Sequence, residues 1–196
     1  MLSTSSDSAP GNHRLWAVLV MVVALVLQVA VANRLPLPGS VTPDLVLLTV
    51  VALALVNGEM VGLVAGFTAG LAADIMPPAD HTIGRYALVY CLVGYLCGLA
   101  SAEMDRSSVV PFVAVAAGAL AGTLLYAGLG MLLGDPRATW AIISRMVPLS
   151  VLYDVLASPF VVWAVLRVTR RVERGKSPGR FDLAPARYRA MSRERI

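Results

Sequence analysis

Small and bulky residues alternate with helical spacing from residue 58 to residue 74, in the stretch GEMVGLVAGFTAGLAAD. Gly58, Gly62, Gly66 and Gly70 recur at steps of four, so on a helix that advances about 100° per residue they share one face with the neighbouring alanines. Each interior glycine costs a soluble helix about 0.8 to 1 kcal/mol relative to alanine, whereas in lipid small residues let two backbones approach closely. We therefore expect a transmembrane helix around which the bundle is organised.

The two sides of this helix have different expected neighbours. The flat glycine face should pack against another helix, either from the same chain or from a partner that crosses the membrane once. The opposite side carries Met60, Val64 and Phe67 and should face acyl chains or a second partner. Asp74 follows the last glycine at the same spacing, near the helix end.

Apolar stretches of similar kind recur along the whole chain. A bilayer is crossed by roughly 20 apolar residues, and a single helix over 44–75 would be too long at 1.5 Å per residue, so a hairpin with a turn at 57–59 is expected. The later stretches repeat the small-residue device, with Gly94 and Gly98 in one and Gly118 and Gly122 in the next. The six expected spans cover residues 15–32, 44–56, 60–75, 85–100, 109–133 and 145–168. The fold class is an all-α integral membrane protein, a compact bundle of six transmembrane helices.

Composition agrees with this pattern, because 58% of the residues are hydrophobic and only 14% are charged. Residues 1–14 are Ser-rich and polar and are expected to be disordered, before the transmembrane domain at 15–168. Ten of the sixteen basic residues lie from Arg167 onward, so 169–196 is expected to be a basic cytoplasmic tail that can rest on anionic lipid. Six spans then place the N-terminus in the cytoplasm as well. The sequence Ala30-Val31-Ala32 could imitate a signal-peptide cleavage site, but we favour an uncleaved span.

Polar residues inside the apolar stretches are few. Thr42, Pro43 and Asp44 have the order of an N-cap, a first helical residue and a first-turn acid, so Asp44 is expected to be structural. In the sixth span Ser150, Asp154 and Ser158 form an i+4 stripe roughly 13 Å along the helix, near the bilayer midplane, and Pro159 should kink the helix there.

The stripe around Asp154 has two interpretations, between which the sequence does not decide. An ionisable residue at this depth is a candidate functional group. Alternatively, Asp154 is hydrogen-bonded to Ser150, to Ser158 or to a tyrosine hydroxyl and holds the kink.

Several motifs together resemble the rod shape-determining MreD family. They are Pro43-Asp44-Leu45 at the start of a span, the glycine series from Gly62 to Asp74, Gly84 before Tyr86, and Gly94-Tyr95-Leu96-Cys97-Gly98. The resemblance implies a non-enzymatic scaffold in the bacterial cytoplasmic (inner) membrane that helps to position peptidoglycan synthases. The partners it implies are an MreC-like bitopic protein and, indirectly, an MreB-like filament, a RodA-like polymerase and a class B penicillin-binding transpeptidase.

The fold is also similar to the substrate-binding membrane subunits of energy-coupling-factor vitamin transporters. That similarity supplies an alternative, in which Asp74, Asp154, Tyr90 and Tyr126 line a solute cavity. An intramembrane enzyme is disfavoured, because the two carboxylates lie at different depths and neither histidine lies within the bundle. We expect no catalytic residue, no metal site, no cofactor and no nucleic-acid partner.

Overall fold

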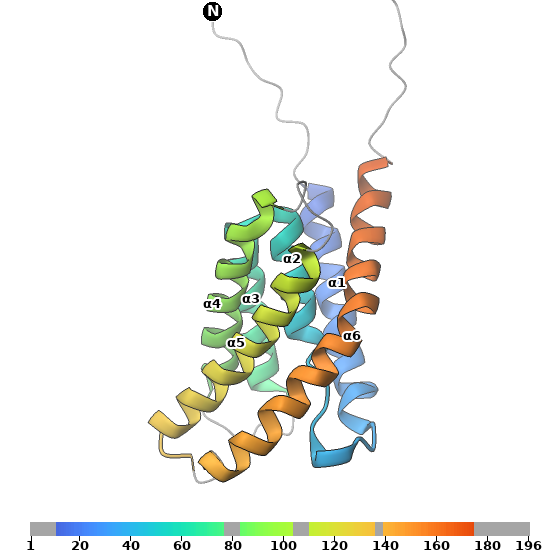
Figure 1. Ribbon diagram of the computed structural model, residues 1–196. Coiled ribbons are helices and arrows are strands. Elements are labelled where there is room, and N and C mark those ends of the chain that lie inside the picture. The colour runs from blue at the N-terminus through green and yellow to red at the C-terminus, as the bar shows by residue number, and fades with distance from the viewer. Residues whose placement is uncertain (1–10, 77–82, 104–109, 136–138, 175–196) are drawn as a thin grey trace, which may run out of the picture.

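The computed structural model describes residues 11–76, 83–103, 110–135 and 139–174. Within these ranges the chain forms six α-helices and three short 3-10 helices, without a strand. The α-helices are α1 (Gly11–Ala30), α2 (Leu45–Asn57), α3 (Glu59–Ile75), α4 (Arg85–Leu99), α5 (Val110–Leu132) and α6 (Trp140–Arg174). Figure 1 shows them side by side in one bundle, with the start of α1 and the end of α6 at the same end.

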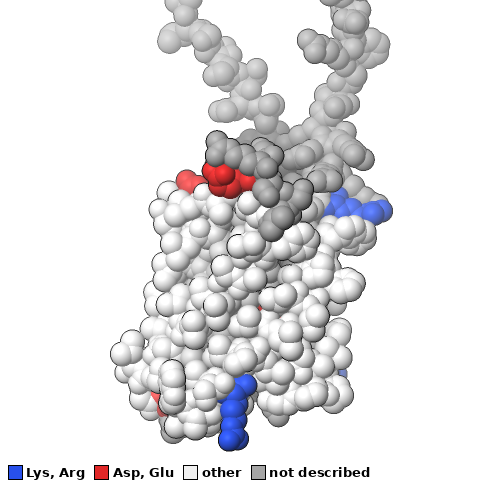
Figure 2. Space-filling view, viewed as in Figure 1, with Lys and Arg blue, Asp and Glu red and all other residues white. Residues whose placement is uncertain are grey.

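Four segments of the described chain are long and apolar enough to cross a membrane: Leu15–Arg34, Arg85–Glu103, Val110–Leu132 and Trp140–Thr169. The other two helices are shorter, since α2 has 13 residues and α3 has 17. Figure 2 shows that charged side chains on one face gather near the two ends of the bundle, with an almost uncharged zone between them. The all-helical fold agrees with the sequence analysis, and length and composition mark four of the six described α-helices as candidate membrane spans.

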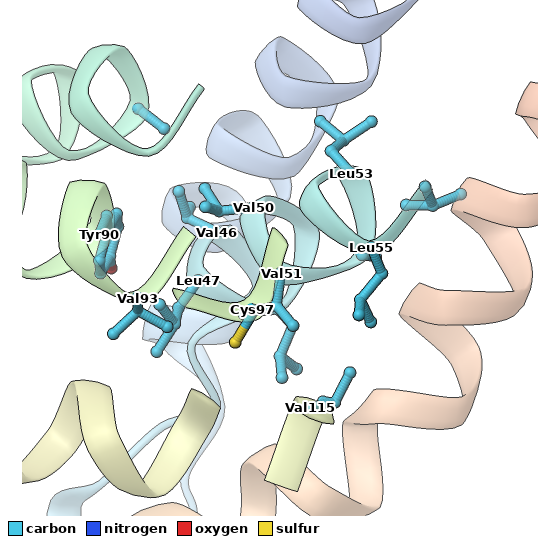
Figure 3. Packing of buried hydrophobic residues seen from close by; sticks show 14 of the residues in the cluster. Val46, Leu47, Val50, Val51, Leu53, Leu55, Tyr90, Val93, Cys97 and Val115 are labelled. Carbon is cyan, nitrogen blue, oxygen red and sulfur yellow. The ribbon is translucent and has the colours of Figure 1, made fainter. Parts of the chain in front are cut away.

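The centre of the bundle is α2, not the glycine-rich segment that the sequence analysis placed there. Ten of its thirteen residues are buried, and it contacts all five other α-helices. Figure 3 shows α2 side chains such as Val46, Val50 and Leu55 surrounded by residues of the neighbouring helices, including Tyr90 and Val115. A helix that is apolar on every side belongs in a core, and the sequence of α2 fits that rule.

The flat face of α3 packs against α4, which belongs to the same chain. A Cβ atom built on Gly62 would overlap the backbone of Gly94, and one built on Gly66 would overlap the carbonyl of Tyr90. Gly70 lies in the same way against Tyr86 and Ala87. The opposite side of α3 is turned outward, and the side chains of Met60, Val64, Phe67 and Ile75 are exposed.

Gly58 has a different role from the other three glycines. Its φ of 89° lies in the left-handed region, and it forms the turn between α2 and α3. A Cβ atom built there would meet only the Ser101 hydroxyl, at 3.9 Å. The predicted hairpin at 57–59 is confirmed, and Gly58 serves the turn instead of the helix contact.

The largest difference from the expected boundaries is in α6. The loop expected at 134–144 is wrong in its second half, because the helix begins at Trp140 and continues to Arg174. Pro148 and Pro159 both lie inside it, and Figure 1 shows α6 running obliquely in its first part and more upright in its second. At the other terminus α1 begins at Gly11, within the segment expected to precede the first span. Residues 1–10 and 175–196 lie outside the described residues.

Candidate functional site

The start of α2 is partly buried in the bundle, and side chains satisfy its first backbone N–H groups. The first N–H groups of any helix lack intrahelical acceptors. Here Leu47 N–H donates to Asp44 Oδ1 at 2.9 Å, and Leu45 N–H donates to Gln28 Oε1 of α1 at 2.8 Å. Asp44 N–H donates to Asp154 Oδ1 of α6 at 2.7 Å. Three side chains from three helices therefore cap α2.

This cap corrects one detail of the sequence analysis. The N-cap residue is Asp44, with the helix proper beginning at Leu45, so Thr42 is not the cap and Pro43 precedes the helix. Asp44 also accepts a hydrogen bond from the Tyr90 hydroxyl of α4, at 2.5 Å on Oδ2. One carboxylate thus connects α2 to α4 while it caps α2.

The bond between Tyr90 and Asp44 gives a first testable prediction. Tyr90→Phe removes only the hydroxyl and should lower the free energy of unfolding by about 1.5 to 3 kcal/mol, because a buried donor to a charged acceptor is lost. Thermal melting of the purified protein measures this effect. Tyr153→Phe is the matched control: its hydroxyl donates to the Pro38 carbonyl at 3.2 Å on the surface, so its loss should change stability by less than about 1 kcal/mol. Equal effects of the two substitutions would contradict the assignment.

Asp154 is 1% exposed and lies where α6 meets the start of α2. Of the three partners considered for it, Ser150, Ser158 or a tyrosine hydroxyl, Ser158 instead donates its hydroxyl to the Val155 carbonyl at 2.8 Å. Its Oδ1 atom is occupied by the Asp44 N–H, but its Oδ2 atom is buried without a hydrogen-bond partner in the described structure. A buried polar atom in that state is unusual.

Asp74 is completely buried and belongs to a different contact. Its Oδ2 atom accepts hydrogen bonds from Gly84 N–H at 2.9 Å and Ala87 N–H at 3.1 Å, and its Oδ1 atom accepts from Tyr86 N–H at 3.1 Å. A carboxylate from the end of α3 therefore caps the beginning of α4, where the helix dipole also favours a negative charge. From the sequence, Asp74 was expected either to have no role or to line a cavity wall, and its capping of α4 was not predicted.

Arg85 is a buried cation that the sequence analysis did not single out. Its guanidinium donates to the Tyr126 carbonyl through Nε at 3.0 Å and Nη2 at 2.6 Å, and through Nη1 to Asp135 at 2.9 Å. It also lies over the Tyr126 ring, 3.7 Å from its centroid. Arg85 therefore ties the start of α4 to the end of α5. A charged residue at the first position of a span is usually interpreted as marking the end of the apolar segment. The sequence therefore did not indicate that Arg85 is buried and connects two helices.

These groups surround a cavity of about 710 Å³ between α1, α2, α4, α5 and α6. Its wall combines apolar side chains such as Val89 and Ile143 with a polar set. Of the four residues expected to line a solute cavity, Tyr90, Tyr126 and Asp154 do so and Asp74 does not. Asp44, Tyr86 and Ser150, which the sequence analysis names for other reasons, line it as well. Asp74, Ser158 and the glycines of α3 are not part of it, although Ala73 at the end of α3 is. In the described ranges no three His, Cys, Asp or Glu side chains gather as metal ligands would.

Comparison with known proteins supplies the family. The sequence profile of the rod shape-determining protein MreD matches residues 12–169, which is most of the chain. The chain belongs to the MreD family. No curated protein matched the chain. The match covers all six helices except the first residue of α1 and the last residues of α6. Membership of the MreD family implies a role in rod shape determination and agrees with a multi-pass membrane protein.

Proposed function

We propose that this MreD-family chain is a non-enzymatic scaffold of the bacterial wall-elongation complex that helps to position peptidoglycan synthases. The observation that carries the proposal is the family match over residues 12–169. The buried polar groups support it as well, because those with the most hydrogen bonds cap helices or join them. Asp44, Asp74 and Arg85 each make at least two such bonds within the chain.

The proposed arrangement is six crossings of the cytoplasmic membrane with both termini in the cytoplasm. Its support is the alternating course of the six helices in Figure 1, with the start of α1 and the end of α6 at one end. The basic residues from Arg167 onward favour the cytoplasm for that end. On this arrangement the cavity lies toward the opposite, outer end of the bundle, and α2 need not match the bilayer thickness because protein surrounds it.

The proposed direct partner is an MreC-like bitopic protein, through which the MreB-like filament, the RodA-like polymerase and the class B transpeptidase are reached. Because α4 occupies the flat face of α3, a partner helix would contact an outward face instead. Such faces are available on α1, α3 and α6, where Val18, Val64 and Phe160 are each more than half exposed. The tail at 169–196 is proposed to rest on anionic lipid.

The test is depletion of the protein in its bacterial host, followed by complementation. Depleted cells should widen and lose their regular pattern of new wall insertion, measured with a fluorescent cell-wall label. An affinity-tagged copy should restore cell width and co-purify with the MreC-like protein. If depletion left cell width unchanged, or if the tagged copy restored width without retaining any wall-synthesis protein, the scaffold proposal would fail.

A further inference from the structure

The lining of the cavity includes one buried polar atom that no described residue satisfies. Asp154 lines the cavity, its Oδ1 atom accepts the Asp44 N–H, and its Oδ2 atom has no partner among the described residues. Leaving a buried polar atom unpaired costs about 1 to 3 kcal/mol, and more for a charged group. No other buried side-chain oxygen or nitrogen of the described residues lacks a hydrogen-bond partner, and both oxygens of Asp44 accept a bond. The arrangement therefore has one free acceptor beside a large space.

The charges of the wall indicate what kind of group would fill that position. The charged side chains that line the cavity are Asp44, Asp135, Asp154 and Arg85. Arg85 pairs with Asp135 at 2.9 Å, so the carboxylates of Asp44 and Asp154 have no described cation beside them. Two neighbouring carboxylates with one open acceptor favour a cation that donates hydrogen bonds. The apolar part of the wall, with Leu25, Val89 and Ile143, favours a hydrocarbon body on that cation.

We infer that this cavity is a binding site for an amphiphilic primary ammonium ion, which donates an N–H to Asp154 Oδ2. A volume of about 710 Å³ lies in the range of small-molecule sites, roughly 300 to 1,000 Å³. The same chemistry occurs in the headgroup of an aminophospholipid and in a free alkylamine. The site is independent of the scaffold role, since it depends only on the groups that surround it.

The lipid source is tested with full-length protein in nanodiscs that contain phosphatidylethanolamine or phosphatidylcholine. The two headgroups carry the same charge, but only the first has ammonium N–H donors. Native mass spectrometry after release from the disc counts the retained lipids. We expect retention of phosphatidylethanolamine over phosphatidylcholine by about tenfold, the effect of one charge-assisted hydrogen bond.

The solute source is tested with delipidated protein in detergent, by thermal melting in hexylamine or in hexanol. Hexylamine should raise the melting temperature and hexanol should not. Asp154→Asn is the central variant in both tests, because its carbonyl can still accept the Asp44 N–H while its amide nitrogen repels an ammonium. Leu156→Ala, on the exposed side of the same helix, is the matched control. Met146→Trp fills the cavity from α6 and leaves Asp154 intact. If Asp154→Asn does not fold, Met146→Trp still tests whether the ligand binds in the cavity.

Preference for phosphatidylethanolamine that Asp154→Asn or Met146→Trp abolishes would establish a lipid site. Stabilisation by hexylamine that the same variants abolish would establish a solute site. Equal retention of both lipids together with no hexylamine effect would overturn the inference, as would effects that persist unchanged in the folded variants. In either of those cases Asp154 Oδ2 accepts a hydrogen bond from water or carries a proton.

Discussion

Replacing Gly66 by leucine should prevent the protein from accumulating in folded form. A Cβ atom at this position would overlap the carbonyl carbon and oxygen of Tyr90 and approach the N–H of Cys91, all of which are backbone atoms of α4. Backbone cannot move aside as a side-chain end can, so α3 and α4 would have to separate. Even Gly66→Ala should lower the free energy of unfolding by about 1 to 3 kcal/mol. Yield and thermal melting in detergent measure both variants.

Gly128→Ala is the control for that experiment. Gly128 lies inside α5, and a Cβ atom built on it meets nothing within 4 Å. Alanine is favoured over glycine inside a helix by about 0.8 to 1 kcal/mol, so this substitution should leave stability unchanged or raise it slightly. The same chemical change would thus have opposite signs at Gly66 and Gly128. If both substitutions were harmless, the close approach of α3 and α4 would be wrong.

The second large effect is expected at Asp74. Asp74→Leu removes the acceptor for three backbone N–H groups at the start of α4, inside a site with no solvent exposure. Each buried donor left unpaired costs about 1 to 3 kcal/mol, so the free energy of unfolding should fall by roughly 3 kcal/mol or more. Thermal melting checks the loss, and hydrogen exchange at the first turn of α4 should rise with it.

Asp74→Asn separates the capping role from other roles of this residue. Asparagine keeps one acceptor oxygen at nearly the same position and also serves as a helix cap. Its effect should therefore be smaller than that of leucine by about half. A loss as large as that of Asp74→Leu would mean that the charge itself matters more than the three hydrogen bonds.

Periodicity in the sequence was sufficient to predict where the helices lie along the chain, but not which helices pack against each other. Apolar runs and turn residues placed α4 and α5 to within one residue at each end. The spacing of Gly62, Gly66 and Gly70 predicted a face for close approach, yet it could not say which helix lies opposite. The helix opposite the glycine face is set by how the connection between α3 and α4 orients α4. The spacing of residues within one helix carries no information on that connection. The central position of α2 could have been predicted from its sequence, because α2 is apolar on every side. Its short length suggested a marginal membrane span instead.

The cavity was harder to predict because its groups come from distant parts of the chain. Asp154 bonds to Asp44, which lies 110 residues earlier, and Arg85 bonds to residues 41 and 50 positions later. The sequence suggested Ser150, Ser158 or a tyrosine hydroxyl as partners of Asp154, because i±4 spacing identifies neighbours on one helix but not a backbone N–H on another. Tyr90 and Tyr126 were named as possible wall residues in a transporter, and they do line this cavity.

The three-helix cap of α2 has a consequence for how the protein is made. Ribosomes synthesise α1 and α2 early, but Asp154 belongs to α6, the last of the six described α-helices. Until α6 docks, the Asp44 N–H at the core of the bundle lacks its acceptor. Synthesis of α6 therefore completes the cap of a helix made much earlier, and a chain that ends after α5 should hold α2 less firmly.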